Sequence, residues 1–195
     1  MPIQIGEKPE SDFTDPIGML GDCHRRIVRY VHVLVVLATQ RKGGQVSDEQ
    51  RALLSTSLRY FREAGPKHTA DEEESLFPRL RSIESPDIEA VLARIESLEQ
   101  DHECADRSQV EVDRLGRLWL TAGQLSSDDA SRFEELVCQL ETLYRHHIGI
   151  EDTEVFPCAA RVLAAVDRQA IGDEMAVRRG LSDAPVPVTL AESPQ

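Results

Sequence analysis

One short motif occurs twice in this chain, and it constrains the fold more than any other feature. Residues 68–78 (HTADEEESLFP) and 147–157 (HIGIEDTEVFP) share the pattern H-x-x-x-E-[ED]-x-[SE]-[LV]-F-P. In an α-helix, residues i and i+4 are rotated by only about 40° from each other, so each His and its Glu lie on one face and can reach a single ion. Each copy therefore predicts half of a metal site. Because the copies are far apart in the sequence, they predict two helices that bring equivalent faces together.

Apolar residues recur at helical spacing through four long stretches of the chain. These stretches are rich in Leu, Glu, Arg and Ala, whereas only 5% of the residues are aromatic, and no strand pattern is found. Short polar breaks separate the stretches. The sequence therefore predicts an all-α fold, an antiparallel up-down-up-down four-helix bundle with a short C-terminal helix.

Local signals mark the ends of the expected helices. Asp15 and Pro16 suit the N-cap and first position of a first helix that ends near residues 41–44. Ser47 with Gln50 three residues later forms a capping box, which predicts the start of a second helix. Gly65-Pro66 interrupts that helix just before His68 and predicts a kink or short break. Further helix openings are expected at residues 85–87 and 126–129, and Gly180 is expected to close a last helical stretch that runs through 159–179.

The chain of 195 residues can bury a substantial core and suits one domain with terminal extensions. We expect a flexible N-terminus over residues 1–13 and the bundle over residues 14–157. A C-terminal helical extension over residues 158–180 and a disordered, Pro- and Ser-rich tail over residues 181–195 complete the expected organisation.

Charge and hydropathy exclude several classes of partner. With 35 acidic and 22 basic residues, the formal net charge of -13 repels phosphate backbones, so nucleic acid is not expected as a partner. The first residues lack the apolar core of a secretory signal, and the longest apolar run, 33–38, is too short to span a bilayer. A cytoplasmic protein without a membrane partner is expected. The cysteines show no C-x-x-C pairing and are predicted to be reduced structural thiols: Cys23, Cys104, Cys138 and Cys158.

Each of the four expected helices carries one His on its apolar face. A single His on such a face would usually be a hydrogen-bonded core residue. Four of them at one level, with two carboxylates beside them, would be costly to bury without a metal. The sequence therefore predicts a metal site formed by His24, His68, Glu72, His102, His147 and Glu151.

With these residues in view, the sequence resembles the haemerythrin-like family, often called the HHE cation-binding domain. The resemblance runs from about Asp15 to Pro157 and is carried by residues 22–25 (DCHR), the two repeated boxes and residues 101–102 (DH). It implies a cofactor of two iron ions with a bridging oxide or hydroxide. In this scheme the four His residues are terminal ligands and the two Glu residues bridge the irons. A donor set of imidazoles and carboxylates without thiolate also favours iron, with manganese second.

The sequence departs from the oxygen-carrying members of that family, which use five His. Those proteins have a second His one turn from that of the third helix, whereas here the neighbouring turns bring Asp106 and Leu98. The missing nitrogen leaves about one open coordination position per iron. Asp106 could fill such a position, bond a ligand imidazole, or simply be solvated.

Other polar residues near the boxes receive structural interpretations. His32 and His146 are rotated by about 80° and 100° from the ligand faces and are expected at the surface or behind the ligands. Cys23 and Cys104 flank ligands in sequence but are expected to point away from them. Glu73, Glu74 and Asp152 are interpreted as a solvated acidic face.

Two classes of function stay open. The first is a non-haem di-iron protein that binds or reacts with O2, NO or peroxide, as in the four-His members linked to nitrosative or oxidative stress and iron-sulfur cluster repair. The second is an iron or oxygen sensor or iron-handling module, whose protein partner the sequence does not name; reversible oxygen binding is a further alternative. The sequence leaves open whether the protein is an enzyme.

Overall fold

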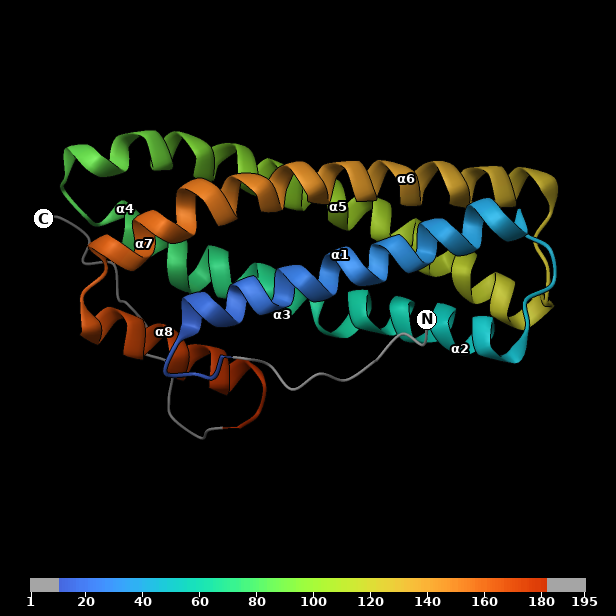
Figure 1. The fold of residues 1–195 in the computed structure, drawn as a ribbon, viewed down its shortest axis with the longest axis horizontal. Helices are drawn as coiled ribbons and strands as arrows, with labels where there is room; N and C mark the ends of the chain where they lie inside the picture. The colour runs from blue at the N-terminus through green and yellow to red at the C-terminus, as the bar shows by residue number, and fades with distance from the viewer. Residues whose placement is uncertain (1–10, 182–195) are drawn as a thin grey trace, which may run out of the picture.

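Four long helical segments run antiparallel along the length of the molecule in this computed structural model, which describes residues 11–181 (Figure 1). The first and third segments are α1 (Pro16–Arg41) and α5 (Glu89–Ala122), the latter preceded by the short η2 (Pro86–Ile88). The second consists of α2 (Asp48–Glu63), α3 (Gly65–Ala70), η1 (Asp71–Leu76) and α4 (Phe77–Arg81). The fourth consists of α6 (Ser127–Ile150), η3 (Glu151–Val155) and α7 (Phe156–Val162), and α8 (Ala165–Arg178) follows. Within residues 11–181 there is no strand, and the predicted all-α four-helix bundle is confirmed.

The helix ends lie where the sequence signals place them. The Asp15 carboxylate accepts a hydrogen bond from the Gly18 backbone N–H at 3.1 Å and caps α1. Ser47 and Gln50 form the expected reciprocal capping box of α2. The chain leaves α1 through Lys42 at a φ of 45°, in the left-handed conformation common at helix C-termini. Gly65-Pro66 produces the predicted break, since α2 ends at Glu63 and α3 begins at Gly65.

Both repeated boxes contain a π-helical segment that the sequence analysis did not predict. In η1 and η3 the backbone turns are wider than in an α-helix, and the Phe77 and Phe156 N–H groups donate to the carbonyls of Glu72 and Glu151, five residues back. A proline follows each Phe, and because proline has no N–H it cannot continue the α-helical bonding pattern. The repeat in sequence is therefore a repeat in backbone conformation.

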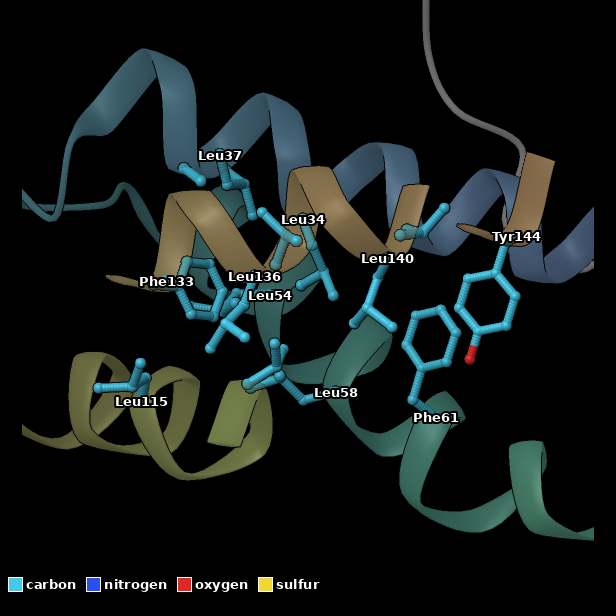
Figure 2. Packing of buried hydrophobic residues seen from close by; sticks show 14 of the residues in the cluster. Leu34, Leu37, Leu54, Leu58, Phe61, Leu115, Phe133, Leu136, Leu140 and Tyr144 are labelled. Atoms are coloured by element: carbon cyan, nitrogen blue, oxygen red, sulfur yellow. The ribbon is translucent and has the colours of Figure 1, made fainter. Parts of the chain in front are cut away.

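Two apolar clusters fill the bundle, one toward each end. The first joins the C-terminal half of α1, α2, the C-terminal half of α5 and most of α6. Figure 2 shows its leucine side chains meeting the rings of Phe61, Phe133 and Tyr144. The second joins the N-terminal parts of α1 and α5 to η1, α4, η3, α7 and α8. The predicted metal ligands fall between these two clusters on every helix.

The C-terminal region differs from the single helical stretch predicted over 158–180. It forms two helices, because Leu163 adopts an extended conformation (φ -71°, ψ 130°) that ends α7 and lets α8 turn back (Figure 1). The reversal allows Ile171 and Met175 to be completely buried in the second apolar cluster. Gly180 closes the stretch at a φ of 69°, as predicted.

Three further expectations concern the ends and the surroundings of the chain. Flexibility over residues 1–13 and disorder over 181–195 fall almost wholly outside the described residues. No described helix is long and apolar enough to cross a membrane. The expected cytoplasmic location stays a prediction.

Candidate metal centre

The structure brings all six predicted site residues into one buried cluster. Each contributes from a different turn of the bundle: His24 from α1, His68 from α3, Glu72 from η1, His102 from α5, His147 from α6 and Glu151 from η3. Both glutamates are completely buried, and none of the four histidines is more than 6% exposed. The cluster forms a polar layer between the two apolar clusters.

The Glu72 carboxylate faces imidazoles from three helices, α1, α3 and α5. Its Oε1 lies 3.3 Å from His68 Nε2 and 3.7 Å from His24 Nε2, whereas its Oε2 lies 3.4 Å from His102 Nε2. Two atoms that bind one ion at the usual 2.0–2.2 Å, at right angles, are about 3 Å apart. The spacing therefore fits a carboxylate shared between two metal positions, with Oε1 facing His24 and His68 and Oε2 facing His102.

Glu151 occupies the equivalent place from the opposite side. Its Oε2 lies 3.1 Å from the Nε2 atoms of both His24 and His147. Among the described residues, the donor atoms form two groups that could each hold an ion, and Glu72 belongs to both. One group is His24, His68 and Glu72; the other is Glu72, His102, His147 and Glu151.

Several of these atoms are buried without a hydrogen-bond partner in the described part of the chain. They include both carboxylate oxygens of Glu72, both of Glu151, and His24 Nε2. Leaving a buried polar atom unsatisfied costs about 1–3 kcal/mol, and more when the group is charged. These oxygen and nitrogen atoms all offer lone pairs toward one another. A bound cation would accept these lone pairs and so satisfy the buried atoms.

Carboxylates contact the Nδ1 atoms of three of the imidazoles, on the side of the ring opposite Nε2. Asp152 Oδ1 lies 2.7 Å from His24 Nδ1, and Glu73 Oε1 lies 2.8 Å from His102 Nδ1. A longer contact of 3.4 Å joins Asp101 Oδ2 to His147 Nδ1. Such partners fix the ring and leave Nε2 free to bind metal.

The interpretation as a solvated acidic face is therefore wrong for Glu73 and Asp152, each of which reaches a cluster histidine of another helix. Glu74 is exposed, as expected, and pairs at the surface with Arg178 of α8. The sequence held one signal for the first two: the residue after the Glu is acidic in both boxes. Their targets could not be read from the sequence, because the contacts join distant segments.

His68 differs from the other three imidazoles, because its Nδ1 is buried without a hydrogen-bond partner among the described residues. Cys23 directly precedes His24 in the sequence and lies beside His68 of the first box. In the same way, Asp101 directly precedes His102 and lies beside His147 of the second box. Burial raises the pKa of the Cys23 thiol, but the neighbouring His68 imidazole and Arg26 guanidinium lower it, to about 7. The expectation that Cys23 points away from the site is thus wrong. The Cys23 thiol thus lies beside His68, whereas the Asp101 carboxylate lies beside His147.

The charges of the cluster shift its titration. Burial lowers the pKa of His102, but bonds to Glu72 and Glu73 raise it, to about 9. Burial likewise opposes protonation of His24, yet Asp152, Glu151 and Glu72 hold its pKa well above the ordinary value. Burial raises the pKa of Glu72, but the surrounding imidazoles outweigh it and keep this carboxylate ionised; the pKa of Glu151 is lowered too. A cation must therefore displace protons to enter.

The remaining sequence candidates lie outside the cluster. Asp106 is exposed and belongs to neither donor group, so the direct-ligand alternative is not supported. His32 is exposed and pairs with Glu141 at 3.0 Å, and His146 is exposed too, as expected. Cys104 is exposed on α5.

A small cavity of about 20 Å³ adjoins His68, His102 and His147. Its other walls are mainly apolar and include Phe61 and Tyr144. A water molecule needs about 10–15 Å³ measured in this way, so the space suits one molecule of that size. A larger cavity of about 390 Å³ lies between α2 and α5 and shares Phe61, Asp106 and Gln109 with the small one.

Residues 15–159 match the family model described as the hemerythrin HHE cation binding domain. The chain belongs to this family. The match covers α1 through most of α7 and thus every residue of the cluster, whereas α8 lies beyond it. A comparison with curated proteins gives no match. As a hemerythrin-family domain with a buried His/Glu cluster, the protein is a metal-binding protein.

Proposed function

We propose that this hemerythrin-family protein is a non-haem di-iron protein that binds or reacts with O2, NO or peroxide. We assign His24 and His68 to one iron and His102 and His147 to the other, with Glu72 and Glu151 joining the two. The oxide or hydroxide bridge implied by the family resemblance belongs to the same proposal. Manganese is the second choice of metal, because the donor set contains imidazoles and carboxylates but no thiolate.

One observation carries the proposal: the carboxylate oxygens of Glu72 and Glu151 are buried and unsatisfied between two pairs of imidazoles. Two cations at this level would use these lone pairs and balance both negative charges. When bound, an iron pair supplies redox chemistry toward small oxygen- and nitrogen-containing molecules. The chain's own residues fix the His24 and His102 imidazoles through their Nδ1 atoms and exclude bulk water with the two apolar clusters.

The size of the small cavity supports a diatomic or similarly small ligand. Its volume of about 20 Å³ suits a molecule of about the size of water beside the histidines. Its walls are mainly apolar, which favours an uncharged molecule. The four-imidazole set leaves open coordination positions for such a ligand.

The sensing alternative has one observation in its favour. Helix α8 lies outside the family match and packs directly on η1, the segment that carries Glu72. A change at the metal site could thus reach a surface helix that another protein could read. Reactivity separates the alternatives, because a sensor without catalysis would bind its ligand but not consume it over repeated cycles.

The test begins with metal content. Iron-loaded wild type is expected to hold two iron ions per chain, and Glu72→Ala or Glu151→Ala should lower both the metal content and the thermal midpoint. Full retention of two ions in either variant would contradict the assignment of the glutamates.

The second step mixes the reduced protein with gas. We expect NO to bind and O2 to oxidise the centre irreversibly in stopped-flow absorption. Oxygen uptake that reverses on evacuation would instead return the protein to the oxygen carriers, and no reaction with either gas would contradict the proposed function.

A further inference from the structure

Two arginines at the C-terminal end of α8, the last helical residue Arg178 and the following Arg179, reach into the bundle beside the metal cluster. Asp71 is completely buried at the start of η1, next in sequence to Glu72. Arg179 reaches both of its carboxylate oxygens, with Nη2 to Oδ2 at 2.6 Å and Nη1 to Oδ1 at 3.2 Å. Arg178 adds a bond from Nη1 to Oδ1 at 3.0 Å. Asp71 is thus held by two guanidinium groups from a segment more than a hundred positions away.

Arg178 also spans the outer surface of η1. Its Nη2 donates to Ser75 Oγ at 2.8 Å and to Glu74 Oε2 at 3.2 Å. Together with the bonds to Asp71, these contacts cover the π-helical segment from its first residue to its fifth. Such wide turns are rare and are found mostly at functional sites, so they need support from their surroundings.

The packing of α8 makes this contact rigid. Ile171 and Met175 are completely buried among residues of α1 and η1. Gly172 lies close to the backbone of the segment that precedes α1. A Cβ added at this position would lie 1.9 Å from the Phe13 carbonyl oxygen. The arginines therefore reach Asp71 from a helix that is itself fixed against the bundle.

The contacts of the other π-helical segment are of a different kind. In η3, Glu154 pairs with Arg94, and both side chains are substantially exposed. Asp152 of η3 turns inward to His24 instead. The two halves of the repeat thus differ in the described structure: α8 supports the half that carries Glu72.

We propose that Arg178 and Arg179 are positioning residues for the metal centre, acting through Asp71 to hold η1 in the conformation that lets Glu72 face both imidazole pairs. Without them, Asp71 is left buried without its two arginine partners, and η1 moves to expose this carboxylate to water. Glu72 moves with its neighbour, so both metal positions lose the carboxylate that they share. The inference rests on the proposed two-metal centre and extends the site beyond the residues matched by the family.

Cobalt(II) titration under argon tests the proposal, because its visible absorption reports coordination geometry without any oxygen chemistry. Wild type is expected to take up two cobalt ions per chain. The Arg178→Gln/Arg179→Gln variant should bind both ions about tenfold or more weakly and show altered bands, since changes to groups behind ligands typically cost 10–100-fold in affinity.

Arg168→Gln is the matched control. Arg168 lies on the same helix and donates to the Ala160 carbonyl of α7 at 3.2 Å, so this substitution removes an arginine contact of α8 without touching η1. If the double variant fails to fold, Arg179→Lys takes its place, because lysine keeps the charge but not the two-point geometry.

Three outcomes decide between the possibilities. Two tight cobalt sites with wild-type bands in the arginine variant would overturn the positioning role. Equal weakening in Arg168→Gln would also overturn it, because α8 would then act only through general stability. A wild type that binds a single cobalt ion would contradict the two-metal centre itself.

Discussion

The residues behind the ligands determine how well the site is preorganised. Asp152 and Glu73 each come from one box and hold the imidazole of a helix outside that box. The two boxes therefore supply glutamates to the buried cluster and, one residue later, fix histidines contributed by α1 and α5. This reciprocal arrangement explains why an acidic residue follows the Glu in both copies.

Replacing Asp152 by Asn tests that role. The amide keeps the size of the side chain but removes the charge that orients His24 and raises its basicity, so metal affinity is expected to fall about 10–100-fold. Competition with a chelator measures it. Glu154→Gln in the same segment is the control, since its exposed pair with Arg94 lies away from the ligands. Equal affinities in the two variants would show that Asp152 does not orient His24.

The thiol beside His68 offers a second test at this scale. Cys23→Asp would give His68 the kind of partner that Asp101 gives His147, so the His24–His68 half should bind metal more tightly, by roughly tenfold. Cys23→Asn supplies similar volume without charge and should not tighten binding. Chelator competition on both variants measures the difference. A Cys23→Asp protein with unchanged or weaker affinity would mean that the partner of His68 is unimportant.

At the scale of helices, glycines show where close packing limits the sequence. Gly149 lies on the exposed side of α6 with open space around it, whereas Gly172 of α8 meets the Phe13 carbonyl. Ala is favoured over Gly inside a helix by about 1 kcal/mol. The same substitution should therefore have opposite effects at the two positions.

We expect Gly149→Ala to raise the thermal midpoint and Gly172→Ala to lower it, the latter by about 1–3 kcal/mol of unfolding free energy, a typical cost of overpacking. Thermal and urea denaturation of the metal-free and metal-loaded forms would measure both. A neutral Gly172→Ala would indicate that α8 can shift away from Phe13 at little cost.

The helices and their ends could be predicted because their signals are local. Caps such as Asp15 and Ser47, and the break at Gly65-Pro66, lie within a few residues of the structure they determine. The turn of α8 could not be predicted, because it depends on burying Ile171 and Met175 against distant helices. The contact of Asp152 with His24 spans 128 positions, so sequence spacing could not reveal it.

For the whole molecule, protons and metal compete for the same buried layer. In the metal-free protein the pKa of His102 is raised to about 9 and that of His24 is raised too. A raised histidine pKa contributes stability that is fully present below the unfolded value of about 6.5 and lost as pH rises through the folded value. The lowered pKa of Glu72 and Glu151 contributes stability above the unfolded value of about 4.3, which is lost as acid protonates them.

The metal-free protein should therefore lose stability between about pH 6.5 and pH 9, whereas the metal-loaded protein should not, because its ligand imidazoles are already neutral. On acidification the loaded protein should release metal before it unfolds. Thermal midpoints of both forms across this range, with metal content in parallel, measure the effect. A metal-free protein whose thermal midpoint does not change from pH 6.5 to about pH 9 would show that the pKa values of the cluster histidines are not raised by folding.

The separation of the apolar interior into two clusters has a consequence for local opening. Each helix passes from one cluster to the other through the polar layer, and without a cation that layer holds charged groups instead of close apolar packing. Amide hydrogens of η1 and η3 should then exchange with solvent through openings much smaller than global unfolding, while amides deep in α5 and α6 stay protected. Metal would slow exchange in both π-helical segments at once, joining two separately opening halves into one cooperative unit.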